Sequence, residues 1–337
     1  MLNGKSILIT GGTGSFGKAF ATRILKKYEK IKRLVIFSRD ELKQFDMSNM
    51  EPFKKKSDKI RFFLGDVRDY DRLKRALDNI DVVIHAAALK QVPAAEYNPM
   101  EFIKTNINGA QNVIEACIEL KIKRVVALST DKAASPINLY GATKLCSDKL
   151  FVAANYYAGV SNFSFSVVRY GNVMGSRGSV IPFFQKIAKS SNKPFPITDK
   201  KMTRFNITLD QSIDTVLFAL KTQQGGEIFV PKLPSYKIPD ICKAIDAKKK
   251  VKVVGIRPGE KINEEMISYN DGFNTIDIGR YYIIMPSRKY QQNKILRYFK
   301  KKNNVKKVKN GFSYNSGNNK KFLSSSDLKK LISNQDF

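Results

Sequence analysis

The sequence lacks several kinds of residue that would point to particular classes of protein. Its 337 residues include no tryptophan, one histidine and three cysteines. A single histidine and the absence of any Cys-x-x-Cys spacing leave no candidate metal site. Cys117, Cys146 and Cys242 follow no pattern, which fits a reducing cytoplasm better than a disulfide-linked fold. No apolar run approaches the roughly 18 residues of a membrane span, and glycines cut short the apolar run that begins within residues 1–10, unlike a signal peptide.

Acidic residues are also scarce. Thirty Asp and Glu stand against sixty Lys and Arg, a formal net charge of +30, which is large enough to attract nucleic acid or an anionic membrane. Residues 289–309 contain no acid and give a nucleic-acid-binding role its best support. The lysines are nevertheless spread over the whole chain, and no nucleic-acid motif accompanies them. We therefore interpret the excess as compositional bias and expect neither nucleic acid nor a membrane as the partner.

The N-terminal region carries a phosphate-binding pattern. Ser6–Thr10 reads as a short apolar strand, residues 18–27 have helical periodicity, and a glycine-rich turn joins them. Glycines allow a tight turn and a close approach of the backbone to a pyrophosphate, and the free amides of a helix N-terminus favour negative charge. A plain strand-to-helix turn is the alternative, but both flanks match. We predict dinucleotide binding through Gly11, Thr13, Gly14, Ser15, Phe16 and Gly17.

A second strand, Arg33–Ser38, ends where this kind of fold places the group that reads the adenosine ribose. An acid at the strand tip would mark NAD. Ser38 and Arg39 instead suit the 2′-phosphate of NADP, because a guanidinium stays charged and donates in pairs. Asp40 keeps NAD open, and an ordinary surface charge is the alternative interpretation of Arg39. Further candidate cofactor contacts are Lys43, Asp66, Val67, Ala86, Lys90 and Thr105.

Short apolar strands alternate with helical segments through about Pro231, which predicts an α/β fold with a Rossmann-type doubly wound parallel sheet. His85 lies on one of these strands, so we interpret it as a core residue rather than a base. The expected organisation is a dinucleotide-binding core at residues 1–172 with further segments near 206–231, a smaller substrate-binding lobe at 173–205 and 232–290, and a basic C-terminal segment at 291–337.

The strand at residues 125–130 delivers several proton-transfer groups to the sheet edge where ligands of parallel sheets bind. Tyr140 and Lys144 stand four residues apart, so on a helix they share one face, and the ammonium would favour ionisation of the phenol and lower its pKa from about 10. Chance spacing on an exposed helix is the alternative, because Tyr-x-x-x-Lys alone is common. With the glycine turn, the pattern predicts a catalytic site at Thr130, Asp131, Lys132, Tyr140 and Lys144.

These motifs resemble those of a known family. The glycine turn, the Tyr-x-x-x-Lys pair and the strand order look like the extended short-chain dehydrogenase/reductases. More narrowly, motifs along nearly the whole chain resemble the inverting UDP-N-acetylglucosamine 4,6-dehydratases that open the pseudaminic acid pathway, which leads to flagellin glycosylation. They are TGGTGSFG (10–17), SRDELK (38–43), GDVR (65–68), AEYNP (95–99), STDKA (129–133), NLYGATK (138–144), RYGN (169–172), GSRGS (175–179) and RPGEK (257–261).

The resemblance implies an NADP-dependent lyase that acts on UDP-N-acetylglucosamine or a related UDP-hexosamine. Tyr140 would take the proton of the 4-hydroxyl while hydride leaves C4, and Lys144 would hold the ribose and stabilise the phenolate. Lys132 would remove the C5 proton and Asp131 would protonate the departing 6-hydroxyl, before hydride returns to C6 and a proton to the opposite face of C5.

As a base, Lys132 needs a pKa well below its usual value of about 10.4. Lys144, an oxidised nicotinamide and partial burial would lower that pKa, whereas Asp131 would raise it. The sequence therefore leaves the division of acid and base roles between Asp131 and Lys132 open.

The same resemblance implies a homo-oligomer, a dimer or a hexamer, and a set of substrate contacts. Solvated surface charge is the alternative for each arginine among these contacts, given sixty Lys and Arg. Three residues near the expected substrate depart from the family's usual histidine, tryptophan and histidine: Gln91, Asn206 and Asn263. The implied substrate contacts are Lys90, Asn172, Arg204, Arg257 and Glu260.

Two other functions stay open within the same fold. A UDP-sugar 4-epimerase would use the same turn, tyrosine and lysine, but it needs no acid–base pair for C5 and C6, so Asp131 and Lys132 argue against it. A silent NADP-sensing protein would keep the turn and could lose the proton-transfer residues, all of which are present here.

Overall fold

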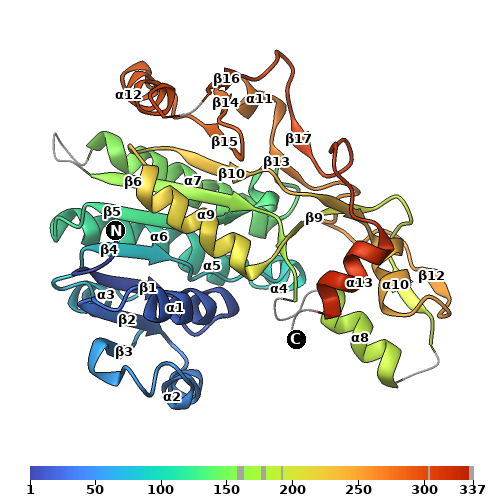
Figure 1. Ribbon diagram of the computed structural model, residues 1–337, viewed down its shortest axis with the longest axis horizontal. Helices are drawn as coiled ribbons and strands as arrows, with labels where there is room; N and C mark the ends of the chain where they lie inside the picture. Colours follow the sequence, from blue (N-terminus) through green and yellow to red (C-terminus); the bar gives the residue numbers. More distant parts are fainter. Residues whose placement is uncertain (158–162, 176–179, 191–192, 303, 334–337) are drawn as a thin grey trace.

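The computed structural model describes residues 1–157, 163–175, 180–190, 193–302 and 304–333. Its main sheet has ten strands, which pair side by side in the order β16 (Lys306–Lys307), β14 (Thr275–Asp277), β15 (Tyr281–Ile284), β10 (Ile228–Pro231), β6 (Ser164–Tyr170), β5 (Arg124–Thr130), β4 (Val82–His85), β1 (Ser6–Thr10), β2 (Arg33–Ser38) and β3 (Ile60–Leu64) (Figure 1). The strands from β3 to β10 are parallel, and the order reverses between β1 and β4, where doubly wound sheets bind ligands.

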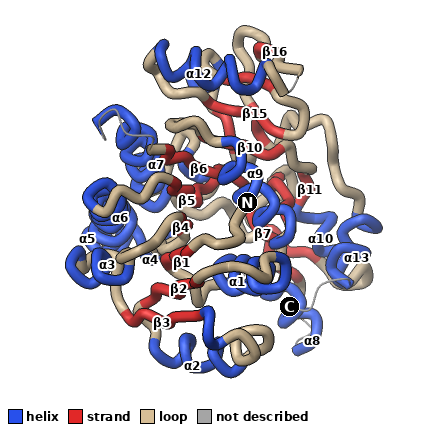
Figure 2. The backbone as a smooth tube through the Cα atoms, turned by 60° about the vertical axis from the view of Figure 1, so that its left-hand side comes forward, coloured by secondary structure: helices blue, strands red, loops and turns tan. Residues whose placement is uncertain are grey.

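Helices cover both faces of this sheet. On one face α1 (Ser15–Lys27) packs against α9 (Leu209–Thr222), and on the other α6 (Gly109–Glu119) packs between α3 (Tyr70–Ala76) and α7 (Leu139–Tyr157) (Figures 1 and 2). Shorter helical segments complete the connections. They are α2 (Glu41–Asn49), a 3₁₀ turn (Ser57–Lys59), α4 (Val92–Tyr97), α5 (Pro99–Phe102), a π-helical segment (Ile103–Asn108) and a second 3₁₀ turn (Asp131–Ala133).

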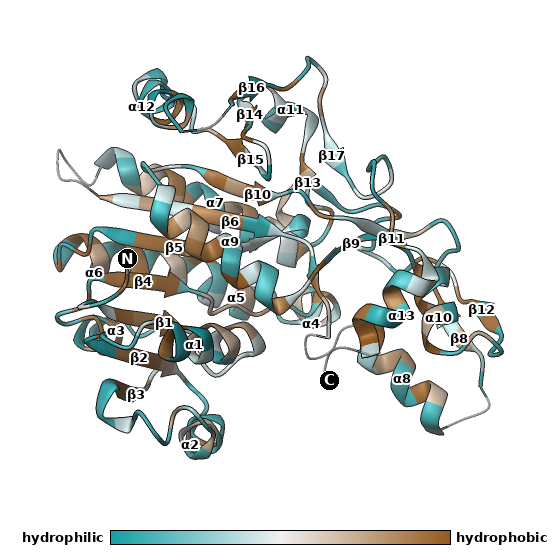
Figure 3. Cartoon of the chain, viewed as in Figure 1, coloured by the Kyte–Doolittle hydropathy of each residue, from teal (hydrophilic) through white to brown (hydrophobic). Residues whose placement is uncertain are grey.

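The central strands are apolar along their whole length, because parallel strands with helices on both faces have no solvated side. All five residues of β1 are buried, as are five of the six in β2. Figure 3 shows these strands in the hydrophobic colour. The predicted α/β fold with a doubly wound parallel sheet is confirmed, including the bounds predicted for β1, β2 and β3.

A smaller lobe lies beside the sheet and has a hydrophobic core of its own, which includes Phe184, Phe195, Ile241 and Leu328. Three small sheets connect or build it: β11–β9–β7, β12–β8 and β13–β17. The remaining elements are β7 (Asn172–Val173), α8 (Val180–Ser190), β8 (Phe195–Ile197), β9 (Thr203–Ile207), β11 (Ser235–Lys237), α10 (Ile238–Ile245), β12 (Val251–Val253), β13 (Glu265–Ile267), α11 (Tyr269–Gly272), α12 (Lys289–Lys300), β17 (Tyr314–Asn315) and α13 (Ser325–Ser333).

The C-terminal third is distributed differently from the sequence-based assignment. β14 and β15 were expected in the substrate lobe, yet they pair antiparallel beyond β10 and so extend the main sheet. The basic segment is also not an appendage, since Ile295 and Phe299 of α12 enter the main core and Leu328 of α13 enters the core of the lobe. Over the described ranges, no helix is both long and apolar enough to cross a membrane.

One buried carboxyl in the fold predicts a pH effect on stability. Glu227, before β10, accepts main-chain hydrogen bonds from Gln224 and Gly225, yet burial raises its pKa from 4.5 to about 7. An acid with a raised folded-state pKa stabilises the fold below pH 4.5, and this contribution is lost as the pH rises through 7. Relative to the Glu227→Gln variant, the wild type should lose about 3 kcal/mol of unfolding free energy between pH 4.5 and 8, measured by urea titration. A pH-independent difference between the two proteins would contradict this expectation.

Candidate active site

The glycine-rich turn lies at the carboxyl end of β1, beside the end of β4. Gly11 has φ +64°, and a Cβ there would come within 2.9 Å of Ala87 Cα, so the turn requires glycine. A Cβ on Gly17 would lie 2.5 Å from the carbonyl oxygen of Gly12. Helix α1 starts at Ser15 without a side-chain cap, which leaves its first amides for an anion. This cradle fits a pyrophosphate, and it also contains Thr13, Gly14 and Phe16.

At the end of β2, the groups predicted to read the ribose have different surroundings. The Asp40 carboxylate caps α2 by accepting from the Lys43 amide at 3.0 Å, and it also pairs with the Lys43 ammonium. The Arg39 side chain is 54% exposed, and its Nη1 lies 3.6 Å from Asp66 Oδ2. Ser38 is buried, and its hydroxyl accepts from Gln44 Nε2. Arg39 is therefore the reader with a side chain turned to solvent, while Asp40 has local partners.

The end of β4 forms the other wall of the presumed cofactor site. The Ala86 amide donates to the Thr10 hydroxyl at 3.2 Å, and burial lowers the pKa of Lys90. Val67 is buried against the surface where a Cβ on Gly109 would fall, 2.6 Å away. Thr105 is buried in the π-helical segment, a feature that often marks functional sites, and its hydroxyl has no partner among the described residues.

Two further residues hold this wall in place. Asn106 clamps the loop after β4, since its side chain accepts from the Leu89 amide at 2.8 Å and donates to the Leu89 carbonyl and the Thr143 hydroxyl. His85 is 1% exposed, and burial followed by the charge of Lys144 lowers its pKa to about 3, so it is neutral. That environment is the one expected of a core histidine.

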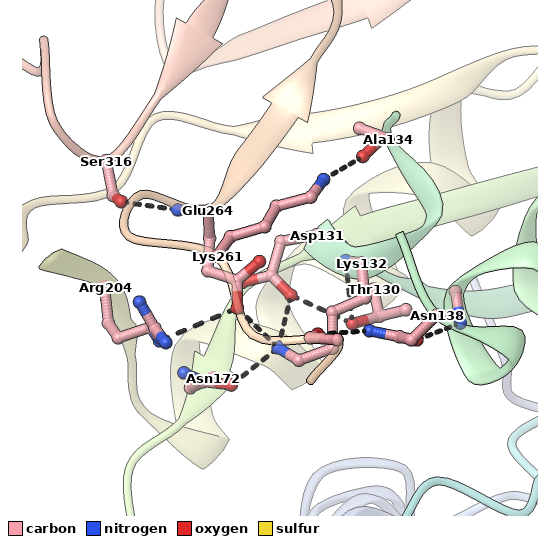
Figure 4. A network of polar contacts seen from close by, with 12 residues as sticks. Thr130, Asp131, Lys132, Ala134, Asn138, Asn172, Arg204, Lys261, Glu264 and Ser316 are labelled. Carbon is pink, nitrogen blue, oxygen red and sulfur yellow. Dashed lines mark hydrogen bonds and ion pairs between the residues drawn. The ribbon is translucent and has the colours of Figure 1, made fainter. Parts of the chain in front are cut away.

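A cluster of charged groups forms where β5 ends (Figure 4). The Lys132 Nζ lies 3.1 Å from Asp131 Oδ1 and 3.1 Å from Glu264 Oε1, and both carboxylates are almost completely buried. The Thr130 hydroxyl donates to Asp131 Oδ1 at 3.0 Å, and Asn172 Oδ1 lies 3.5 Å from the Lys132 ammonium. One ammonium therefore bridges two carboxylates that come from distant parts of the chain.

This arrangement sets the protonation of the cluster. Burial by itself lowers the pKa of Lys132, but Asp131 and Glu264 together raise it above its usual value. Burial raises the pKa of Asp131, against the opposing charge of Lys132. The lowered lysine pKa that a base requires is therefore not present in this state of the protein. Asp131 has the properties of an acid, whereas Lys132 is an ammonium.

Tyr140 and Lys144 share one face of α7, but their interaction differs from the prediction. Burial raises the pKa of Tyr140 to about 12, and the cation that opposes this effect is Lys132 rather than the expected Lys144. Lys144 donates from Nζ to the Leu128 carbonyl at 2.8 Å, and burial lowers its pKa. Tyr140 therefore belongs to the charged cluster at the end of β5, and Lys144 lies one turn deeper.

The residues expected to bind substrate fall into two groups. Asn172 faces the cluster, and Arg204 on β9 lies next to it, with Nε 3.6 Å from Glu264 Oε1. Arg204 is 9% exposed and donates from Nη1 to the carbonyls of Thr203 and Ile262, so the predicted paired donation to a diphosphate would require these bonds to break. Arg257 is exposed on a loop, and its amide faces the Glu260 carboxylate at 3.3 Å. Residues 176–179 of the GSRGS motif lie outside the described residues.

The sequence did not identify Glu264, Tyr236 or Asn106. Glu264 follows the RPGEK motif by three residues, which is the one signal that could have suggested it. Tyr236 on β11 is buried beside Asn172, and burial raises its pKa to about 12. Within the described ranges, no three His, Cys, Asp or Glu side chains are arranged to hold a metal ion.

The sheet order, the glycine turn and the Tyr140–Lys144 helix together define an extended short-chain dehydrogenase/reductase. The sequence profile of the polysaccharide biosynthesis protein family matches residues 7–286, and the chain belongs to this family. The UDP-N-acetylglucosamine 4,6-dehydratase (inverting) of Campylobacter jejuni (strain 81-176) is 52% identical over 100% of this chain and 99% of its own. The resemblance found in the sequence is thus confirmed.

Two other similar proteins bear on the interpretation. A UDP-glucose 4-epimerase of Rickettsia bellii (strain OSU 85-389) is 43% identical over 99% of this chain and 96% of its own length. The X-ray structure of Pen from Bacillus thuringiensis superimposes with a TM-score of 0.87 at 39% identity, covering 99% of both chains. The fold is therefore shared along almost the whole length of the molecule.

Proposed function

We propose that the protein is a configuration-inverting 4,6-dehydratase that converts UDP-N-acetylglucosamine to a UDP-4-keto-6-deoxy-hexosamine. The observation that carries this proposal is the buried Asp131–Lys132 pair beside Tyr140, because a dehydration needs an acid and a base in addition to the oxidising tyrosine site. The 52% identity to a dehydratase of that name supports it. A 4-epimerase would leave the buried pair without a chemical role.

The residues divide the reaction among them. When bound, the nicotinamide cofactor takes a hydride from C4 of the sugar and returns it at C6. Tyr140 takes the proton of the 4-hydroxyl, which makes C4 a ketone and the C5 hydrogen acidic. Lys132 then removes the C5 proton, and Asp131 protonates the 6-hydroxyl so that it leaves as water. A proton delivered to the opposite face of C5 completes the inversion.

We further propose NADP as the cofactor, because Arg39 is the solvent-facing cation at the end of β2 and Asp40 is engaged in capping α2. Arg39→Ala should raise the KM for NADP roughly ten- to a hundredfold, the effect of losing one charged hydrogen bond. The KM for NAD should stay the same, which is the internal control in initial-rate measurements. An equal loss with both cofactors, or no loss with NADP, would contradict this assignment.

The finer biological setting follows from the same resemblance. We propose that the enzyme is a homo-oligomer and that its product enters pseudaminic acid biosynthesis and flagellin glycosylation. Support for the oligomer comes from the family likeness alone, and size-exclusion chromatography with light scattering would test it.

Proton NMR in deuterated water tests the reaction itself. The purified protein, UDP-N-acetylglucosamine and catalytic NADP should give a new C6 methyl signal and deuterium at an inverted C5. Retained configuration at C5 would overturn the inverting assignment, and a 4-epimer without a methyl signal would identify an epimerase. No turnover would overturn the choice of this sugar nucleotide.

A further inference from the structure

Glu264 is placed with unusual precision for a residue in a loop. Its amide donates to the Ser316 hydroxyl at 2.9 Å and its carbonyl accepts from the Ser316 amide at 2.8 Å, while Ser316 is fully buried. Its side chain is 4% exposed and reaches the Lys132 ammonium at 3.1 Å (Figure 4). The second carboxylate oxygen, Oε2, is buried without a partner among the described residues. The fold thus delivers an incompletely satisfied carboxylate to the proposed base.

Such a carboxylate is costly unless it has a function at the site. Removing charges from water offsets most of the attraction within a buried ion pair, so the pair contributes little to stability. Each negative charge within about 4–6 Å of an ammonium nevertheless favours its protonated form strongly. The other titratable and charged groups that face the pair are Asp131, Tyr140, Arg204, Tyr236 and Lys261.

We propose that Glu264 is a positioning residue for the dehydration: it holds the Lys132 side chain in place and sets the pH at which this lysine becomes a base. The proposal rests on the proposed function, since it assigns Lys132 the C5 proton. Glu264 lies between the RPGEK loop and β13, so the chain that carries Arg257 and Glu260 also carries the counter-ion of the base. The catalytic unit is then Asp131–Lys132–Glu264 rather than the adjacent pair alone.

Glu264→Gln separates position from charge, because the amide oxygen can still accept the lysine hydrogen bond. Without that negative charge the pKa of Lys132 should fall, so the rising limb of the C5 deuterium-exchange rate against pH should move to lower pH by about one unit or more. Below the limb this shift is a roughly tenfold faster exchange for each unit. Glu264→Asp keeps the charge and should restore the limb toward the wild-type position.

Glu265→Gln is the matched control. Glu265 is the next residue, and its carboxylate accepts from the Ser135 hydroxyl at 2.7 Å, away from Lys132. This variant should leave the limb where it is in the wild type. Coincident pH profiles of E264Q, E265Q and the wild type would overturn the proposal while leaving the dehydratase function intact.

A second measurement does not depend on turnover. Competitive labelling with acetic anhydride at a series of pH values, read by mass spectrometry of the peptide that contains Lys132, reports the pKa of that lysine. The pKa should be lower in E264Q than in the wild type and in E265Q, whichever sugar the enzyme uses. If E264Q fails to fold, E264D should show a smaller decrease, because its carboxylate is withdrawn. An unchanged labelling pKa in the folded variant would overturn the proposal.

Discussion

Lys132→Ala should abolish C5 deuterium exchange and product formation, with a fall in kcat of about a thousandfold or more. The loss of a general base accounts for two to four orders of magnitude. Here the loss should lie at the upper end, because removal of the ammonium also leaves Asp131 and Glu264 facing each other without a cation. NADP binding, measured by calorimetry, should persist, since the glycine turn lies on β1 and α1.

Lys26→Ala provides the control for this experiment, because Lys26 is an exposed lysine near the end of α1, where alanine is well tolerated. It should leave exchange unchanged. Exchange that survives in K132A would transfer the C5 proton to Asp131 or Tyr140. Lys132→Met, which keeps much of the side-chain volume, distinguishes a chemical loss from a packing defect, and it should be as inactive as K132A.

Local sequence patterns were sufficient to predict the frame of the molecule. A parallel strand buried on both faces is written as a continuous apolar run, so β1, β2 and β3 could be delimited from the sequence. The turn after β1 has a geometry that only glycine satisfies at Gly11, which is why the motif was informative. The Tyr140–Lys144 face followed from helical spacing.

Long-range contacts explain what the sequence could not provide. Glu264 meets Lys132 across 132 positions of the chain, and no local periodicity announces such a contact. The pKa of Lys132 depends on that unseen carboxylate, so the balance of acid and base could not be predicted. β14 and β15 are three- and four-residue strands that join the main sheet by pairing with β10 and with each other, and their short apolar patterns do not specify which sheet they extend.

Arg169→Ala should lower the free energy of unfolding by about 3–5 kcal/mol, the usual cost of leaving a buried charge without its partner. Arg169 on β6 is 1% exposed and lies 3.1 Å from Asp148 Oδ2 on α7 and 3.1 Å from Asp271 Oδ2 on α11. Its Nη1 also donates to the Met266 carbonyl at 3.0 Å. Urea unfolding at pH 7.5 measures the loss, and the slope of the transition verifies that unfolding stays two-state.

The pH dependence of this variant identifies the cause of the loss. Asp148 is 2% exposed at its side chain, and without Arg169 its pKa should rise in the folded state. A folded-state pKa above the unfolded one means that the deficit relative to the wild type shrinks as the pH falls toward 5. Arg23→Ala, which breaks the partly exposed pairs with Asp210 and Asp214, should cost about 1 kcal/mol or less at any pH. A deficit of that size in R169A, or one that does not vary with pH, would show that the buried charge of Asp148 is not what destabilises the variant.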